Sequence, residues 1–146
     1  MNQFAPDYFQ GLALDPNASF EPKPFQYVYN PPNNVLGANQ EIDGASVSIH
    51  TDADFYLYAV YLSLYTGPFQ FRLADSTGYQ LDSGMINSGA YSQSSNQPTV
   101  KSPAHLFPAG SDIFLDIEDL SGAPNPLQIV FVGVKMYKIA GRSPRQ

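Results

Sequence analysis

Apolar and polar residues alternate along several segments of this 146-residue chain, and no ten-residue window has the spacing of an amphipathic helix. The alternation is clear in residues 45–49, 69–73 and 113–117, whereas residues 55–64 are apolar or aromatic at almost every position. A period of two is typical of a strand with one buried face, and a continuous apolar run is typical of a strand covered on both sides. The chain is therefore expected to be all-β.

Turn signals separate these segments, at residues 66–68, 75–78 and 109–110. Residues 79–82 are expected to form a hairpin partner, and residues 87–98, which are small and polar, a long surface loop. The last strand, residues 127–139, is the most apolar. Seven or eight strands at near-regular spacing predict an antiparallel β-sandwich, of a jelly-roll-like kind, with negligible helix.

Residues 1–39 differ from the rest, because six of the thirteen prolines lie in the first 32 positions. Proline favours extended backbone, and the spaced aromatic and leucine side chains make this segment too apolar for a free tail. We expect an extended N-terminal arm over 1–39, a β-sandwich body over 40–139 and a basic C-terminal tail over 140–146. The arm is expected to lie on another surface, with packing on its own domain as the alternative. Its candidate contact residues are Phe4, Tyr8, Phe9, Phe20, Phe25 and Tyr27.

The formal net charge is −6, from 7 basic and 13 acidic residues, so the chain as a whole lacks the basic character of a nucleic-acid-binding protein. Four of the seven basic residues fall in the last twelve positions. This basic end is either a solubilising tail or a docking end for an acidic partner surface. Its residues are Lys135, Lys138, Arg142 and Arg145.

No motif for catalysis is present: the chain has no Cys, no Gly-x-Ser-x-Gly, no P-loop and no dinucleotide-binding glycine pattern. His50 precedes Asp52 and Asp54, a sequence that suits a turn better than a metal site. His105, between two prolines, is expected to pack in a loop. The acidic residues of the segment 112–119 lack calcium-loop spacing and are expected on a solvated or partner-facing strand. They are Asp112, Asp116, Glu118 and Asp119.

From these patterns we expect no enzyme activity, no cofactor and no required metal. No apolar stretch approaches the roughly 20 residues of a membrane helix, and no signal peptide is visible, which predicts synthesis in a cytoplasm and no membrane partner.

Several turns and strand ends resemble those of small β-rich virion proteins of tailed bacteriophages, in particular capsid cement or decoration proteins. The resemblance covers about residues 40–139 and lies in Asp52–Phe55, Phe71–Tyr79, Pro108–Ile113 and Ile129–Lys135. It implies a structural protein made in the host cytoplasm, carried on the capsid surface of the virion, that binds the major capsid protein and stabilises the head. It also implies a homo-oligomer, a dimer or trimer, with the arm tying subunits together, and no catalytic residues.

The alternative is a carbohydrate- or receptor-binding module of a phage tail, using Tyr and Asp side chains on an exposed face. Under the first reading, a chain without residues 1–32 is expected to fold but not to bind.

Overall fold

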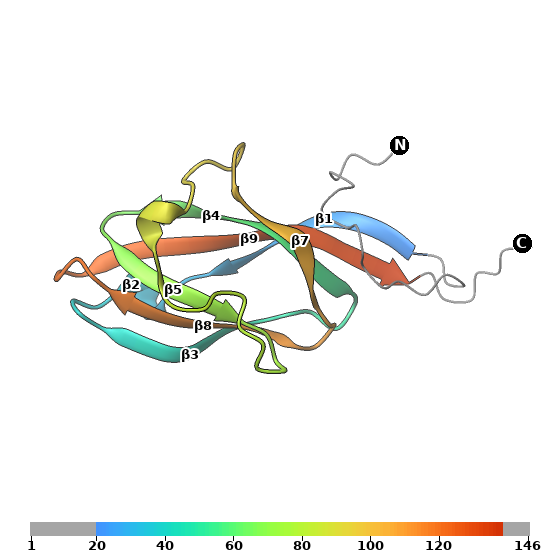
Figure 1. Ribbon diagram of the computed structural model, residues 1–146, viewed down its shortest axis with the longest axis horizontal. Coiled ribbons are helices and arrows are strands. Elements are labelled where there is room, and N and C mark those ends of the chain that lie inside the picture. Colours follow the sequence, from blue (N-terminus) through green and yellow to red (C-terminus); the bar gives the residue numbers. More distant parts are fainter. Residues whose placement is uncertain (1–19, 139–146) are drawn as a thin grey trace, which may run out of the picture.

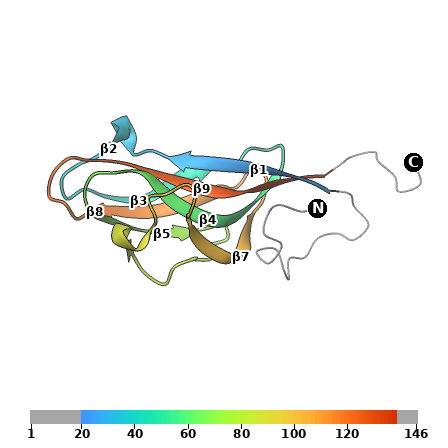
Figure 2. The ribbon, with the colours of Figure 1, turned by 90° about the horizontal axis from the view of Figure 1, so that it is seen from above.

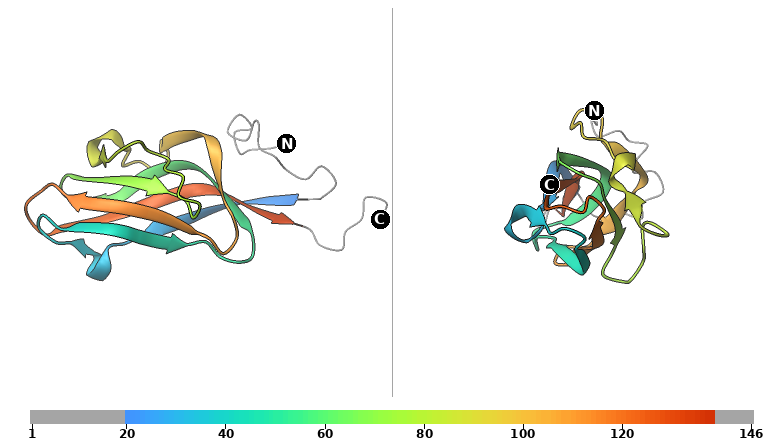
Figure 3. Two further views of the ribbon diagram at one scale, coloured as in Figure 1. Left: turned by 60° about the horizontal axis from the view of Figure 1, so that its bottom comes forward. Right: turned by 90° about the vertical axis from the view of Figure 1, so that its left-hand side faces the viewer.

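The computed structural model describes residues 20–138, which form two antiparallel sheets packed as a sandwich (Figures 1–3). The five-stranded sheet has the order β1-β9-β4-β7, with the short β2 also paired to β9; the four-stranded sheet has the order β3-β8-β5-β6. The strands of the first are β1 (Phe20–Tyr29), β2 (Val35–Leu36), β4 (Asp54–Tyr65), β7 (Thr99–Phe107) and β9 (Asn125–Lys138). Those of the second are β3 (Glu41–Ser48), β5 (Phe69–Ala74), β6 (Ile86–Asn87) and β8 (Asp112–Asp119). Within this range the helical content is limited to 3₁₀ turns at Pro32–Asn34 and Ser88–Ala90, so the predicted all-β antiparallel sandwich is confirmed.

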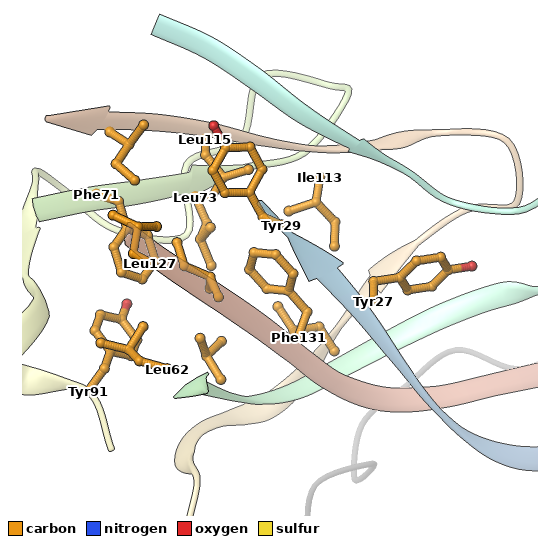
Figure 4. Close-up of a cluster of buried hydrophobic side chains, with 14 of the residues drawn as sticks. Tyr27, Tyr29, Leu62, Phe71, Leu73, Tyr91, Ile113, Leu115, Leu127 and Phe131 are labelled. Carbon is orange, nitrogen blue, oxygen red and sulfur yellow. The ribbon is translucent and has the colours of Figure 1, made fainter. Parts of the chain in front are cut away.

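The core lies between the inner faces of the two sheets (Figure 4). Strands β5 and β8 bury every second residue, which follows from the alternation in the sequence. Five phenylalanines are among its largest fully buried side chains: Phe55, Phe69, Phe71, Phe107 and Phe131. Two tyrosines of β1, Tyr27 and Tyr29, complete it.

The second half of the predicted arm belongs to the sandwich itself. Residues 20–29 pair with residues 129–138 along the whole of β1, and Leu36 of β2 is fully buried. The boundary expected at residue 39 therefore moves toward the N-terminus, and residues 1–19 lie outside the described part of the chain. Pro22 and Pro24 are compatible with β1 because it is an edge strand, where a missing N–H breaks no ladder.

Strand β7 has no counterpart among the expected strands, because Pro103 interrupts its pattern and follows a cis peptide bond. It is also an edge strand, and its pairing with β4 is irregular between Leu57 and Ala59. The hairpin expected at residues 79–82 is reduced to one bridge, between Ala74 and Gln80. In the loop predicted at residues 87–98, Asn87 ends β6, Ser88–Ala90 form a 3₁₀ turn and the rest contains no helix, although Ser88 and Tyr91 are buried.

Asp119, at the end of β8, joins three connecting segments. Its carboxylate is 2% exposed and accepts hydrogen bonds from the backbone N–H groups of Asn39 (2.8 Å), Ser121 (3.2 Å) and Gly122 (3.0 Å), and from Asn125 Nδ2 (3.1 Å). Burial alone would raise the pKa of Asp119, but the hydrogen bonds from Ser121, Asn39 and Asn125 lower it to about 2. The ionised carboxylate is therefore the form that stabilises the fold.

Replacing Asp119 by Asn should lower the free energy of unfolding at neutral pH by about 1–3 kcal/mol, since the amide turns an N–H₂ toward groups that donate. Because the folded pKa lies below the ordinary value of 3.8, the wild-type advantage is complete above about pH 5 and declines as the pH falls toward 2. Urea unfolding at several pH values measures this, with Asp43→Asn on exposed β3 as the control. If the difference in the free energy of unfolding between wild type and Asp119→Asn stays constant from pH 7 to pH 2, the ionised Asp119 carboxylate is not the group that stabilises the fold.

Candidate functional site

The outer face of the five-stranded sheet, the side turned away from the core, is unusually apolar. Among the described residues six large hydrophobic side chains are exposed, and four of them lie on this face: Val28, Leu64, Val100 and Leu106. The strand register places them on this face. Val28 pairs with Val130, and Leu106 pairs with Tyr56, while the neighbouring pairs along the same strands point to the opposite side of the sheet. The half-buried Val132 and Met136 continue the same face along β9, whereas Val130 and Val134 on this face are buried. We call these residues the apolar outer face.

The four-stranded sheet presents the opposite character on its outer face. Apart from Phe114 and Ala74, its side chains are mostly polar, and several are joined across strands: Arg72 Nε to Asp116 (3.0 Å), Gln70 Nε2 to Glu118 (2.8 Å) and Ser48 Oγ to Asp112 (2.9 Å). Three of the four acidic residues considered in the sequence thus lie on this polar face, and the fourth is the buried Asp119. Large exposed apolar faces mark interaction sites, so the five-stranded sheet is the better candidate.

The two segments expected to dock start side by side. Phe20, where β1 begins, is paired with Lys138, where β9 ends, so the described part of the chain begins and ends at adjacent positions at one end of the sandwich (Figures 1 and 2). Lys138 is exposed there, and Lys23 lies 5.6 Å from the centre of the Tyr137 ring. Phe4, Tyr8, Phe9, Arg142 and Arg145 lie outside the described residues.

Of the arm candidates that are described, Phe20 and Phe25 are half-buried and Tyr27 is buried in its own domain. Phe25 packs edge-on against Tyr27, with ring centres 4.8 Å apart, and the Tyr27 hydroxyl accepts a hydrogen bond from the His50 backbone N–H (3.0 Å). Phe25 and Tyr27 therefore take part in the packing of their own sandwich.

Lys135 also differs from its expected role in an exposed basic end, because it is only 3% exposed. Its ammonium lies 3.1 Å from both carboxylate oxygens of Asp52, 3.0 Å from His50 Nδ1, and 3.9 Å from the centre of the Phe25 ring. Burial alone would lower the pKa of Lys135, but the hydrogen bond and charge of Asp52 raise it. The side chain points inward because it alternates with outward Val134 and Met136, so it is a structural cation.

The two histidines are both held by neighbouring groups. His50 and Asp52 share the Lys135 ammonium, and Asp54 accepts a hydrogen bond from the Ala109 N–H at 2.9 Å. The Tyr137 hydroxyl donates to Asp52 (2.7 Å) and, with Lys135, lowers the pKa of that carboxyl. His105 lies beside Asp75, at 2.9 Å. Within residues 20–138 no three His, Asp or Glu side chains are grouped closely enough to hold a metal ion.

Neither a protein-family model nor a curated protein nor a solved structure matches this chain. In the described part of the chain, no helix has the length and hydrophobicity needed to span a membrane.

The apolar outer face was missed in the sequence, although a signal for it was present. Residues 127–136 are apolar at positions of both parities, with Gln128 and Lys135 as the exceptions. In a two-layer sandwich with no third layer, the second apolar row has to face outward.

Proposed function

We propose that this protein is a structural virion protein that binds the major capsid protein on the surface of a tailed-phage head and stabilises the assembled lattice. The observation that supports this most strongly is the pairing of Phe20 with Lys138 beside an apolar sheet face. Because of this pairing, the apolar segment 1–19 and the basic segment 139–146 are both attached to the domain next to its apolar outer face.

The order of the strands agrees with this proposal. Apart from the two-residue β2, eight strands form two sheets of four, the first strand pairs with the last, and the chain changes sheet at every step except β5 to β6. We infer a jelly-roll topology from this order; that fold is common in viral capsid proteins and in lectins.

We assign residues 1–19 of a neighbouring copy as the occupant of the apolar outer face. The segment carries Phe4, Tyr8 and Phe9, whose chemistry matches that of the face. Its nineteen residues can span about 60 Å at roughly 3.3 Å per residue. That exceeds the length of the fourteen-residue β9, about 47 Å at the rise of a strand. The segment is therefore long enough to leave its own sheet and lie on an adjacent one.

Charges placed on the apolar outer face should weaken assembly without unfolding the domain. We expect the wild-type chain to sediment with assembled heads that lack it. The double variant Leu64→Glu, Leu106→Glu should bind at least about tenfold more weakly, which corresponds to about 1.4 kcal/mol. Leu120→Glu is the matched control, because Leu120 is similarly exposed but lies in the loop after β8.

Light scattering on the free chain tests the assigned occupant. A dimer or trimer that becomes a monomer in the double variant supports a neighbouring copy. If the wild-type chain is a monomer at every concentration, the occupant of the face is not a neighbouring copy. If the double variant binds heads as well as wild type does, the apolar outer face does not take part in assembly.

A further inference from the structure

A groove along β7 adjoins the apolar outer face, since Val100 of that face also lines the groove. It lies between this edge strand and the segment that follows β5, and it has a volume of about 370 Å³. Its lining includes Tyr79, Leu81, Lys101, Ser102, Ala104 and His105. Small-molecule sites usually have volumes of about 300–1,000 Å³ and combine apolar walls with a few fixed polar groups.

An exposed aromatic ring forms one end of this groove. Tyr79 is 61% exposed, the highest value among the large hydrophobic side chains described, and its ring stacks on His105 with centres 5.5 Å apart and planes inclined by 10°. Because one face of the Tyr79 ring rests on His105, this exposure belongs mainly to the other face. That face is an apolar platform beside the groove.

A single buried carboxylate holds both rings of this platform. Asp75 Oδ2 lies 2.9 Å from His105 Nε2, and Asp75 Oδ1 accepts a hydrogen bond from the Tyr79 backbone N–H at 3.1 Å. The Asp75 N–H in turn donates to the Tyr79 carbonyl (2.9 Å), and Phe107 packs edge-on against His105. The exposed ring is therefore fixed before any ligand arrives, which reduces the entropy lost on binding.

Polar groups form the other end. Lys101 Nζ lies 3.1 Å from Asp82 Oδ1 and 5.3 Å from the centre of the Tyr91 ring, and Asp82 Oδ2 accepts the Leu73 N–H. Ser102 is exposed between this ion pair and the platform, in a stretch of β7 that turns at the cis peptide before Pro103. Since the charge of Lys101 is balanced by Asp82, the groove offers hydrogen-bonding groups without an unpaired cation.

We propose that this groove binds a neutral saccharide, with a sugar ring stacked on Tyr79 and its hydroxyl groups hydrogen-bonded to Lys101 and Ser102. A pyranose ring has an apolar C–H face and a polar edge, which matches a fixed aromatic platform next to paired polar groups. Anionic ligands fit less well, because the nearest cation is already paired and the chain carries a net charge of −6. This proposal does not rest on the proposed role on a phage head.

The test is an NMR titration of the full chain with neutral sugars: glucose, galactose, mannose, N-acetylglucosamine and their β-linked disaccharides. At least one sugar is expected to give saturable shifts at Tyr79, Lys101 and His105. Tyr79→Ala should weaken that binding about tenfold or more, which corresponds to about 1.4 kcal/mol, because it removes the aromatic platform. Tyr79→Phe should retain binding, because the ring alone supplies the platform.

Leu120→Ala is the control, as it removes an exposed apolar side chain elsewhere, and melting curves establish that each variant is folded. Saturable binding that needs the Tyr79 ring supports the site. The proposal fails if no sugar of the panel shifts these residues, if Tyr79→Ala binds as well as wild type, or if only anionic sugars or peptides bind.

Discussion

Replacing Gly133 by alanine is expected to lower the free energy of unfolding by roughly 3 kcal/mol, although the change adds a single methyl group. Gly133 lies in the middle of β9, paired with Phe25 of β1 on one side and Leu57 of β4 on the other. A Cβ at this position would collide with the Tyr56 carbonyl oxygen and would lie 2.5 Å from Cζ of the Phe55 ring. The carbonyl belongs to the backbone of β4, so relief requires the two central strands to move apart.

Chemical denaturation of Gly133→Ala measures this effect, with Gly84→Ala as the control. A Cβ at Gly84 meets nothing within 4 Å, and its backbone does not need the left-handed region. The control is therefore expected to match wild type. If Gly133→Ala is as stable as Gly84→Ala, β4 and β9 are not packed as described.

Removing residues 1–32 is expected to unfold the domain, whereas removing residues 1–19 is expected to leave its melting transition intact. The longer deletion takes away β1, including Tyr27 and Tyr29 of the core. Truncating one large core aromatic side chain costs about 3–5 kcal/mol, so losing two is comparable with a total stability of about 5–15 kcal/mol. The longer deletion also leaves the backbone N–H and C=O groups of β9 unpaired on the side that β1 occupies.

Circular dichroism with heating separates the two deletions. The expected result is a cooperative transition for the chain without residues 1–19 and none for the chain without residues 1–32. This revises the expectation from the sequence, in which the longer deletion left a folded body. A cooperative transition near the wild-type temperature in the longer deletion would mean that β1 is dispensable.

The strands that could be predicted from the sequence are those whose pattern is local. In β5 and β8 nearly every inward residue is apolar and nearly every outward residue is polar or small, with Asp119 and Phe114 of β8 as the exceptions, so the period of two identifies both the strand and its buried face. Among the strands longer than two residues, those that were not foreseen are β1 and β7, which are the edge strands of the five-stranded sheet and both contain proline. Proline is tolerated there only because one side of each strand is unpaired, which depends on the finished sheet.

The roles of Lys135 and Asp119 could not be predicted for a related reason. Both are charged residues in or at the end of strands, and their partners are distant in sequence: Asp52 for Lys135 and Asn39 for Asp119. Charge near one end of a chain suggests exposure, but the strand alternation turns Lys135 inward. The groove beside Tyr79 depends in the same way on Asp75 meeting His105, thirty residues further along.

The most direct test of the assembly proposal is the binding of the chain without residues 1–19 to assembled phage heads that lack the protein. Its melting transition is measured first, so that loss of binding is not confused with loss of folding. The account predicts that the full chain sediments with the heads and raises the temperature at which they disrupt, and that the folded truncated chain does neither. Binding by the truncated chain equal to that of the full chain, or no binding by the full chain, would contradict it.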